Sequence, residues 1–189
     1  MPTLSRPANK ASKAAAGAES ARVAVLADTH TSLDLARQAL RQIGPVDAVI
    51  HLGDYYADAM RLAAELAVPM HAVKGDNDFE EGLYERVVEL SGRRLFLTHG
   101  HFFEGPEALD ELAAEARSRD CAAALFGHTH APIVERRDGV LLVNPGALYF
   151  AEAKKTFALL QIRPGSMTAE IFSLDEKSLP TLSFTETRA

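Results

Sequence analysis

The chain has 189 residues, of which 47% are hydrophobic and 24% are charged, and its formal net charge at pH 7 is −6. This length and composition are typical of one soluble globular domain. Its single cysteine, Cys121, excludes a disulfide within the chain and favours a reducing compartment, so we expect a cytoplasmic protein. The acidic balance makes nucleic acid an unlikely partner, but it does not exclude a small phosphate ester.

The N-terminal segment, residues 1–21, is rich in Ala, Ser, Lys and Pro, and we interpret it as a disordered leader. It contains no apolar stretch of the kind that a secretory signal needs. No run in the chain is long enough to span a membrane, so no membrane partner is expected. The globular domain is expected over residues 22–178 and a flexible tail over residues 179–189.

The first half of the domain alternates apolar runs with helical patterns. Apolar spacing at Leu33, Ala36, Leu40 and Ile43 predicts a helix that ends at Gly44. The predicted order is strand, helix, strand, helix, strand over residues 22–27, 32–44, 46–51, 57–67 and 69–73. Such βαβαβ segments form parallel sheets with their helices outside.

The second half contains two hairpin signals, at Ser91-Gly92 and at Asp138-Gly139. Between them lie a helix over residues 106–119, with Pro106 near its first turn, and a strand-like run over residues 121–127. Residues 155–162 and 168–174 form a final antiparallel pair. The whole predicts an α/β fold with two sheets packed face to face and helices on both outer sides.

Polar residues follow five of the predicted strands at their carboxyl ends, where ligands bind in open α/β sheets. A glycine adjoins them in four of the five segments, which allows tight turns and close backbone approach. The five segments are Asp28-Thr29-His30, Gly53-Asp54, Gly75-Asp76-Asn77-Asp78, His99-Gly100-His101 and Gly127-His128-Thr129-His130.

The spacing of His128 and His130 suits a metal ion, because extended backbone would direct both rings to one side. Each segment alone is a weak signal. Gly53-Asp54 is also common helix-cap chemistry. We interpret His51 and His71, which lie within strands, as packing residues. The combination of all five segments in this order is what indicates a metal site.

The series D-x-H, G-D, G-[ND]-x-[DE], T-H-G-H and G-H-T-H resembles the calcineurin-like metallophosphoesterase superfamily. The compact length and the segment LTHGH resemble its small single-domain bacterial and archaeal phosphodiesterase branch. The resemblance covers roughly residues 23–160. It implies a four-layer αββα sandwich with two mixed β-sheets.

The resemblance also implies a hydrolase with two divalent metal ions, each held by three ligands and both bridged by one carboxylate. The implied sets are Asp28, His30 and His130, then Asp76, His99 and His128, with Asp54 as the bridge. Mixed imidazole and carboxylate ligands suit Mn, Fe, Zn or Ni, and we expect Mn²⁺. A metal-bridging hydroxide would then attack the phosphorus of a small-molecule phosphodiester.

Two residues depart from the family pattern. The family usually has asparagine where this chain has Asp76, so the ligands carry three negative charges instead of two, which favours a singly charged diester over a monoester. Larger members have a histidine near the leaving group where this chain has Asn77, which cannot act as an acid. His101 is then the candidate general acid, although it could be only a hydrogen-bonding loop residue.

Two further residues are candidates for the layer behind the ligands. Asn144, in an Asn-Pro-Gly turn, could orient a metal-bound histidine, and a plain turn residue is the alternative. Asp78 could accept a hydrogen bond from the site or cap a helix.

Two other functions compete with the hydrolase. A retromer-type subunit resembles the same small fold but acts as a protein-binding scaffold, and a nuclease would share the metal chemistry. Metal-capable side chains at all seven expected ligand positions favour the enzyme. A homodimer is left open.

Overall fold

The computed structural model describes residues 20–175. The predicted leader and tail lie outside these residues, apart from residues 20 and 21. Strand β1, Ala21–Leu26, begins one residue earlier than expected. None of the helices in the described part is long and apolar enough to cross a membrane.

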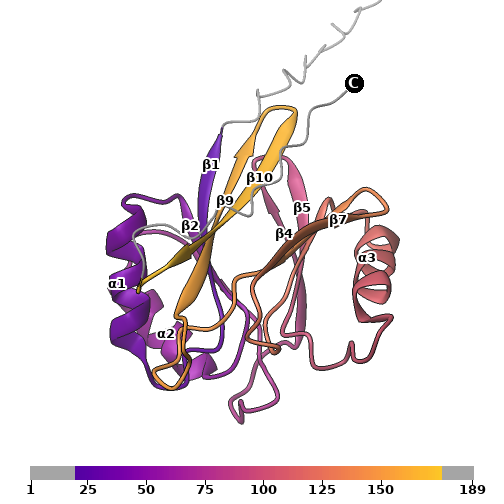
Figure 1. Cartoon of the computed structure of the whole chain (residues 1–189). Coiled ribbons are helices and arrows are strands. Elements are labelled where there is room, and N and C mark those ends of the chain that lie inside the picture. The colour runs from indigo at the N-terminus through magenta and orange to yellow at the C-terminus, as the bar shows by residue number, and fades with distance from the viewer. Residues whose placement is uncertain (1–19, 176–189) are drawn as a thin grey trace, which may run out of the picture.

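The first sheet has the strand order β10-β9-β1-β2-β3. β1, β2 (Ala48–His51) and β3 (Met70–Ala72) run parallel, whereas β9 (Thr156–Arg163) and β10 (Ser166–Ser173) form an antiparallel hairpin beside β1. Helices α1 (Leu33–Ile43) and α2 (Tyr56–Glu65) cover its outer face (Figure 1). The predicted βαβαβ order is therefore confirmed, and the last two strands of the chain make this sheet mixed.

The second sheet has the strand order β4-β5-β6-β8-β7. β4 (Glu85–Leu90) and β5 (Arg93–Thr98) form the first predicted hairpin, and β7 (Ile133–Arg137) and β8 (Val140–Asn144) form the second. β6 (Ala123–Leu125) lies parallel to both of its neighbours, β5 and β8. Helix α3 (Ala108–Ser118) covers the outer face of this sheet (Figure 1).

Three apolar clusters separate the layers. The central cluster joins the facing sides of the two sheets, for example Val25 and Ile50 of the first with Leu97 and Leu125 of the second, all fully buried. One outer cluster lies between the first sheet and α1 and α2, and the other between the second sheet and α3. The predicted four-layer αββα sandwich with two mixed sheets is confirmed.

The predicted helix before Gly44 is confirmed as α1, but its buried face only partly matches the four apolar positions that indicated it. Ala36 and Ile43 are buried as expected, but the other buried positions are Leu35 and Ala39. Leu33 and Leu40 are only partly buried at the edge of the same cluster. Both sets fit helical spacing, and the sequence period alone does not fix the rotation of a helix on its sheet when the apolar stripe is wide.

The carboxyl ends of β1, β2, β3, β5 and β6 meet at one edge of the sandwich. Backbone hydrogen bonds join the loops that leave them: the Asp28 N–H donates to the Gly53 carbonyl at 3.0 Å, and the Gly127 N–H donates to the His99 carbonyl at 2.7 Å. The parallel strands of the two sheets thus bring all five polar segments to the same place.

Candidate metal centre

Two glycines allow the carboxylates to come close to neighbouring loops. A Cβ atom on Gly75 would lie 2.1 Å from Asp54 Oδ1, and one on Gly127 would lie 2.7 Å from Asp28 Oδ2. Both distances are shorter than any real Cβ contact, so any larger residue would displace a carboxylate. The glycines that adjoin the polar segments therefore have the role that their positions predicted.

Five candidate ligands have left-handed backbone conformations, which are uncommon for residues other than glycine. The φ angles are positive at Asp28, His30, Asp54, His128 and His130. The expectation that extended backbone aligns His128 and His130 is therefore wrong, since their φ angles are +68° and +55°. Such conformations cost about 1–3 kcal/mol each and persist where the surrounding fold enforces them, typically at functional sites.

The first group of ligand atoms comes from Asp28, His30 and His130, whose atoms lie within 4.8 Å of one another. His130 Nε2 lies 3.3 Å from Asp28 Oδ1. Asp28 is fully buried, whereas the two histidines are partly exposed. The group therefore combines a buried carboxylate with two imidazoles that face the solvent side of the centre.

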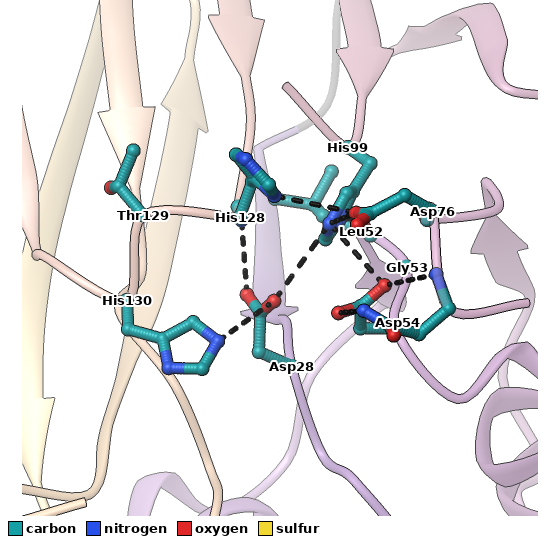
Figure 2. A network of polar contacts seen from close by, with 12 residues as sticks. Asp28, Leu52, Gly53, Asp54, Asp76, His99, His128, Thr129 and His130 are labelled. Atoms are coloured by element: carbon teal, nitrogen blue, oxygen red, sulfur yellow. Dashed lines mark hydrogen bonds and ion pairs between the residues drawn. The ribbon is translucent and has the colours of Figure 1, made fainter. Parts of the chain in front are cut away.

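The second group consists of Asp76, His99 and His128, again with ligand atoms within 4.8 Å. Asp76 Oδ1 lies 3.1 Å from His99 Nε2 and 3.3 Å from His128 Nδ1. Figure 2 shows the His128 and His99 rings converging on Asp76. Consequently, the two histidines of the G-H-T-H segment belong to different groups, with His128 in this one and His130 in the first.

Asp54 lies between the two groups. Its Oδ1 is 3.3 Å from His99 Nε2 (Figure 2). Its Oδ2 is 3.5 Å from His30 Nε2. The residue is only 3% exposed. Each oxygen of this one carboxylate therefore faces a different group, as a bridging ligand would.

The orientation of the His99 ring fits a metal ligand. Its Nδ1 lies 2.8 Å from the Leu52 carbonyl oxygen. Because a carbonyl only accepts, the Nδ1–H donates to it, and Nε2 faces the carboxylates of Asp54 and Asp76. A cation between Nε2 and these oxygens would be bound by all three groups.

Three buried side-chain atoms at the centre of the described site have no hydrogen-bond partner, namely Asp28 Oδ1, His30 Nε2 and His99 Nε2. Buried polar atoms in proteins are rarely left unpaired. Cations between the carboxylates would satisfy all three. The residues present fit divalent cations that accept both nitrogen and oxygen ligands.

The Calcineurin-like phosphoesterase superfamily domain model matches residues 22–165. The chain belongs to this family. Among its relatives, a probable metallophosphoesterase of Bacillus subtilis is 27% identical over 154 residues, which are 79% of this chain and 89% of the relative. A phosphodiesterase of Methanocaldococcus jannaschii is 28% identical over 143 residues, covering 66% of this chain and 82% of the relative.

Solved structures agree with this membership. A predicted phosphoesterase from Streptococcus pneumoniae is 26% identical and superposes with a TM-score of 0.71, over 89% of this chain and 98% of the other. Vps29 of Entamoeba histolytica shares the fold, with a TM-score of 0.69 at 24% identity over 87% of this chain and 98% of the other. The chain is therefore a metallophosphoesterase homologue of the small phosphodiesterase branch.

Glu152 is a residue of this phosphoesterase that the sequence patterns missed. Its Oε1 lies 2.6 Å from His130 Nδ1, on the side of the ring opposite Asp28. The Asp28 carboxylate and then that of Glu152 raise the pKa of His130 to about 9. A carboxylate behind a metal-binding imidazole fixes its orientation and raises its basicity. Glu152 lies in the β8–β9 loop, in a segment with no motif to signal it.

The residues expected behind the ligands contact backbone. Asp78 accepts hydrogen bonds from the Tyr56 N–H at 2.6 Å and from the Gly75 N–H at 2.8 Å, so it joins the start of α2 to the loop that carries Asp76. Asn144 donates to the Gly127 carbonyl at 2.8 Å and accepts from the Gly146 N–H at 2.8 Å. Asn144 therefore holds the loop of His128 and His130 through the Gly127 carbonyl and through the Thr129 hydroxyl, to which it donates at 3.1 Å, and has no hydrogen bond to either ring among the described residues.

Asn77 and His101 lie on the Asp76 side of the centre. Asn77 Nδ2 donates to Asp54 Oδ2 at 2.7 Å, and its backbone N–H donates to Asp54 Oδ1 at 3.2 Å. The His101 ring centroid lies 5.5 Å from that of His99 and 6.3 Å from that of His128. Burial, followed by the neighbouring His99, lowers the pKa of His101 below its usual value.

His51 supports the centre from inside the core. It is fully buried, and burial lowers its pKa to about 4, so it is neutral at pH 7. The Gly53 N–H donates to its Nδ1 at 3.3 Å, so Nε2 carries the proton and donates to Thr29 Oγ1 at 3.2 Å. Thr29 in turn donates to buried Asp58 at 3.0 Å. The packing role predicted for His51 therefore includes a polar chain that sequence reasoning missed.

We expect Glu152→Gln to weaken the binding of one of two metal ions, because the amide removes the negative charge behind His130. Loss of such a partner lowers metal affinity about 10- to 100-fold. Calorimetric titration of metal-free protein with Mn²⁺ would measure this as one weakened and one unchanged site. Glu89→Gln, an exposed β4 carboxylate with no ion pair among the described residues, is the control. Two unchanged sites in Glu152→Gln would contradict the role.

Proposed function

We propose that this protein is a phosphodiesterase that uses two divalent metal ions to hydrolyse a small-molecule phosphodiester. The observation that carries the proposal is the position of Asp54, whose two oxygens face two separate groups of ligand atoms. Membership of the phosphoesterase family and the relatives named as phosphodiesterases support the same reaction. The physical argument rests on the donor set, which is suited to a pair of cations that share one carboxylate.

The proposed ligands divide as the resemblance implied. Asp28, His30 and His130 would hold one ion, and Asp76, His99 and His128 the other, with Asp54 shared. Ions bound there would supply the nucleophile from water at neutral pH and neutralise charge on the phosphoryl oxygens. Asn77 would hold the Asp54 carboxylate through its two hydrogen bonds. Glu152 would orient His130 through its hydrogen bond to Nδ1.

Manganese is the metal that we propose, with Fe, Zn and Ni as alternatives. Four imidazoles and three carboxylates mix nitrogen and oxygen donors, which disfavours Mg²⁺ and Ca²⁺. Mn²⁺ accepts both donor types and is held less tightly than the later divalent ions of the series.

The first test is metal content and metal-dependent turnover. Purified protein should contain or take up two equivalents of metal, measured by elemental analysis. A chelated sample should lose hydrolysis of bis(p-nitrophenyl) phosphate and recover it with Mn²⁺. Asp54→Asn should lower kcat by at least about 100-fold, because the variant weakens both sites together. A sample that binds no metal and stays inactive with every divalent salt would contradict the proposal.

Asp76 supports the preference for a diester. Its carboxylate lies within 3.3 Å of both His99 and His128, so its charge acts directly on the centre. The third carboxylate, beyond Asp28 and Asp54, lowers the net positive charge of the loaded centre by one. A phosphate monoester dianion is then attracted less strongly, relative to a diester monoanion, than it would be with asparagine at this position.

Asp76→Asn should therefore raise the ratio of kcat/KM for p-nitrophenyl phosphate to that for bis(p-nitrophenyl) phosphate. The expected change is about fivefold, corresponding to about 1 kcal/mol for two unit charges about 4 Å apart in water. Steady-state kinetics at saturating Mn²⁺ would measure it. Asp34→Asn, which removes an exposed charge on α1, should leave the ratio unchanged. An unchanged ratio in Asp76→Asn would exclude the charge argument.

His101 is the proposed general acid. Its ring lies beside the second group of ligands, and its Nδ1 is buried without a hydrogen-bond partner. A proton donor matters most when the departing alcohol is weakly acidic. Because the pKa of His101 is lowered, a smaller fraction of its rings carries the proton at neutral pH.

We expect His101→Ala to lower turnover of an alkyl phosphodiester about 100-fold while turnover of bis(p-nitrophenyl) phosphate changes little, because p-nitrophenolate leaves without protonation. Comparing the two substrates in the same preparation controls for losses of metal or of folded protein. Equal losses on both substrates would assign His101 a structural role.

A protein-binding scaffold built on the same fold is the main alternative. The complete set of metal-capable side chains favours the enzyme over a scaffold that lacks hydrolytic activity. A nuclease is disfavoured by the acidic chain, and a DNA affinity that falls with salt concentration would revive it.

A further inference from the structure

Exposed hydrophobic side chains gather around the metal centre. The described part of the chain exposes seven large hydrophobic residues. Met60 lies in α2, and the remaining six lie in loops that carry candidate site residues: Tyr55, Phe79, Leu83, Tyr84, Phe102 and Phe150. Exposed rings that pack together beside a polar site indicate contact with a partner or ligand, whereas a single exposed side chain such as Phe79 is common on protein surfaces.

Two of these rings, Tyr84 and Phe102, form a connected row with His101 that continues outward from the ligands. The His101 ring lies 5.5 Å from the His99 ring and packs against the Phe102 ring at 3.9 Å. The Tyr84 ring lies 5.5 Å from His101 and 5.7 Å from Phe102. We refer to Tyr84, His101 and Phe102 as the aromatic wall. It begins at the Asp76, His99 and His128 group and ends at rings that are 40% and 58% exposed.

The wall is held in place from behind. Lys74 is 8% exposed, and its ammonium group lies 4.8 Å from the centroid of the Tyr84 ring. The Lys74 backbone N–H also donates to the Leu83 carbonyl at 2.8 Å, next to Tyr84. A cation over a ring face restrains that ring. Because Tyr84 is already fixed, a ligand that packs on its exposed part loses little conformational entropy in the process.

The charges near the wall favour an uncharged ligand group. The loops over residues 74–84 and 99–107 contain one cationic side chain, that of Lys74, which is buried against Tyr84. Their exposed acidic residues include Glu80, Glu81 and Glu104. A further phosphate or carboxylate on the ligand would be repelled there, whereas a neutral planar ring would pack on aromatic surface.

We infer that the aromatic wall binds a planar, uncharged aromatic group of the phosphodiester, which is either an aryl group attached at phosphorus or a nucleoside base. The inference rests on the proposed function, since it assigns a substrate class to that same centre. An aromatic ring attached directly at phosphorus would reach His101 and Phe102, whereas a base carried on a sugar would reach Tyr84 and the outer part of the wall.

Three phosphonate monoanions test the inference. Methyl methylphosphonate carries no ring, methyl phenylphosphonate replaces one methyl group by phenyl, and thymidine 5′-methylphosphonate replaces the methoxy group by a nucleoside. All three carry one negative charge. Their inhibition constants against bis(p-nitrophenyl) phosphate, measured with Mn²⁺-loaded enzyme, therefore differ only through the added group. At least one ring-bearing compound should bind about tenfold more tightly than methyl methylphosphonate, as expected for a favourable aromatic pair.

Tyr84→Ala and Phe102→Ala should each reduce that preference about threefold or more, while Tyr84→Phe should retain it. Phe79→Ala is the matched control, because Phe79 is 96% exposed on the same loop as Tyr84 and has no ring contact among the described residues. The preference is a ratio, so general damage to the metal centre cancels. A preference for methyl phenylphosphonate would indicate an aryl group at phosphorus, and a preference for thymidine 5′-methylphosphonate would indicate a nucleoside base.

The failures of the two proposals are distinguishable. Enzyme that hydrolyses bis(p-nitrophenyl) phosphate but binds all three phosphonates equally would overturn the aromatic wall alone. A preference for a ring-bearing phosphonate that is unchanged in both Tyr84→Ala and Phe102→Ala would also overturn the aromatic wall alone. Metal-loaded protein that hydrolyses no diester would overturn the proposed function and this inference with it.

Discussion

Three carboxylates and four imidazoles converge on a space in which neighbouring ligand atoms are 3.1–4.0 Å apart. Without cations this arrangement is unfavourable, because carboxylates held this close together repel one another. The fold must therefore hold the groups together against their own repulsion. Bound cations would replace this repulsion by attraction between metal and carboxylate. Metal binding should therefore stabilise the loops that carry the ligands.

The restraint comes from structure that lies outside the ligands. Five ligand positions have left-handed φ angles, and Gly75 and Gly127 allow contacts that no Cβ atom would permit. The chain from Gly53 through His51 and Thr29 to Asp58 fixes the loops after β1 and β2 from the core side. The geometry of the centre is thus a property of the sandwich, and the ligands alone would not maintain it.

Period and position predicted two packed sheets and the meeting of polar residues at one edge, whereas the family resemblance supplied the four-layer architecture and the set of seven candidate ligands. Polar residues at the carboxyl ends of parallel strands necessarily meet at one edge. The sequence did not predict the rotation of α1, the left-handed backbone at His128 and His130, or the contact of Glu152 with His130. These depend on tertiary packing: Glu152 lies in a loop without a motif, and nothing local brings it to a ring 22 residues away.

The strands position the candidate ligands, whereas the loops form the surface around them, and this separation allows one fold to serve different functions. The strand ends fix the ligand positions, so the centre can stay constant while the outer loops change. Vps29 shares the sandwich with this chain. In the present protein a full donor set lies at the strand ends and a row of rings lies outside it, on loops, which tolerate variation in sequence. Chemistry at the strand ends and selectivity in the loops are then separable. Loss of the rings should change which ester binds, whereas loss of Asp54 should remove the reaction itself.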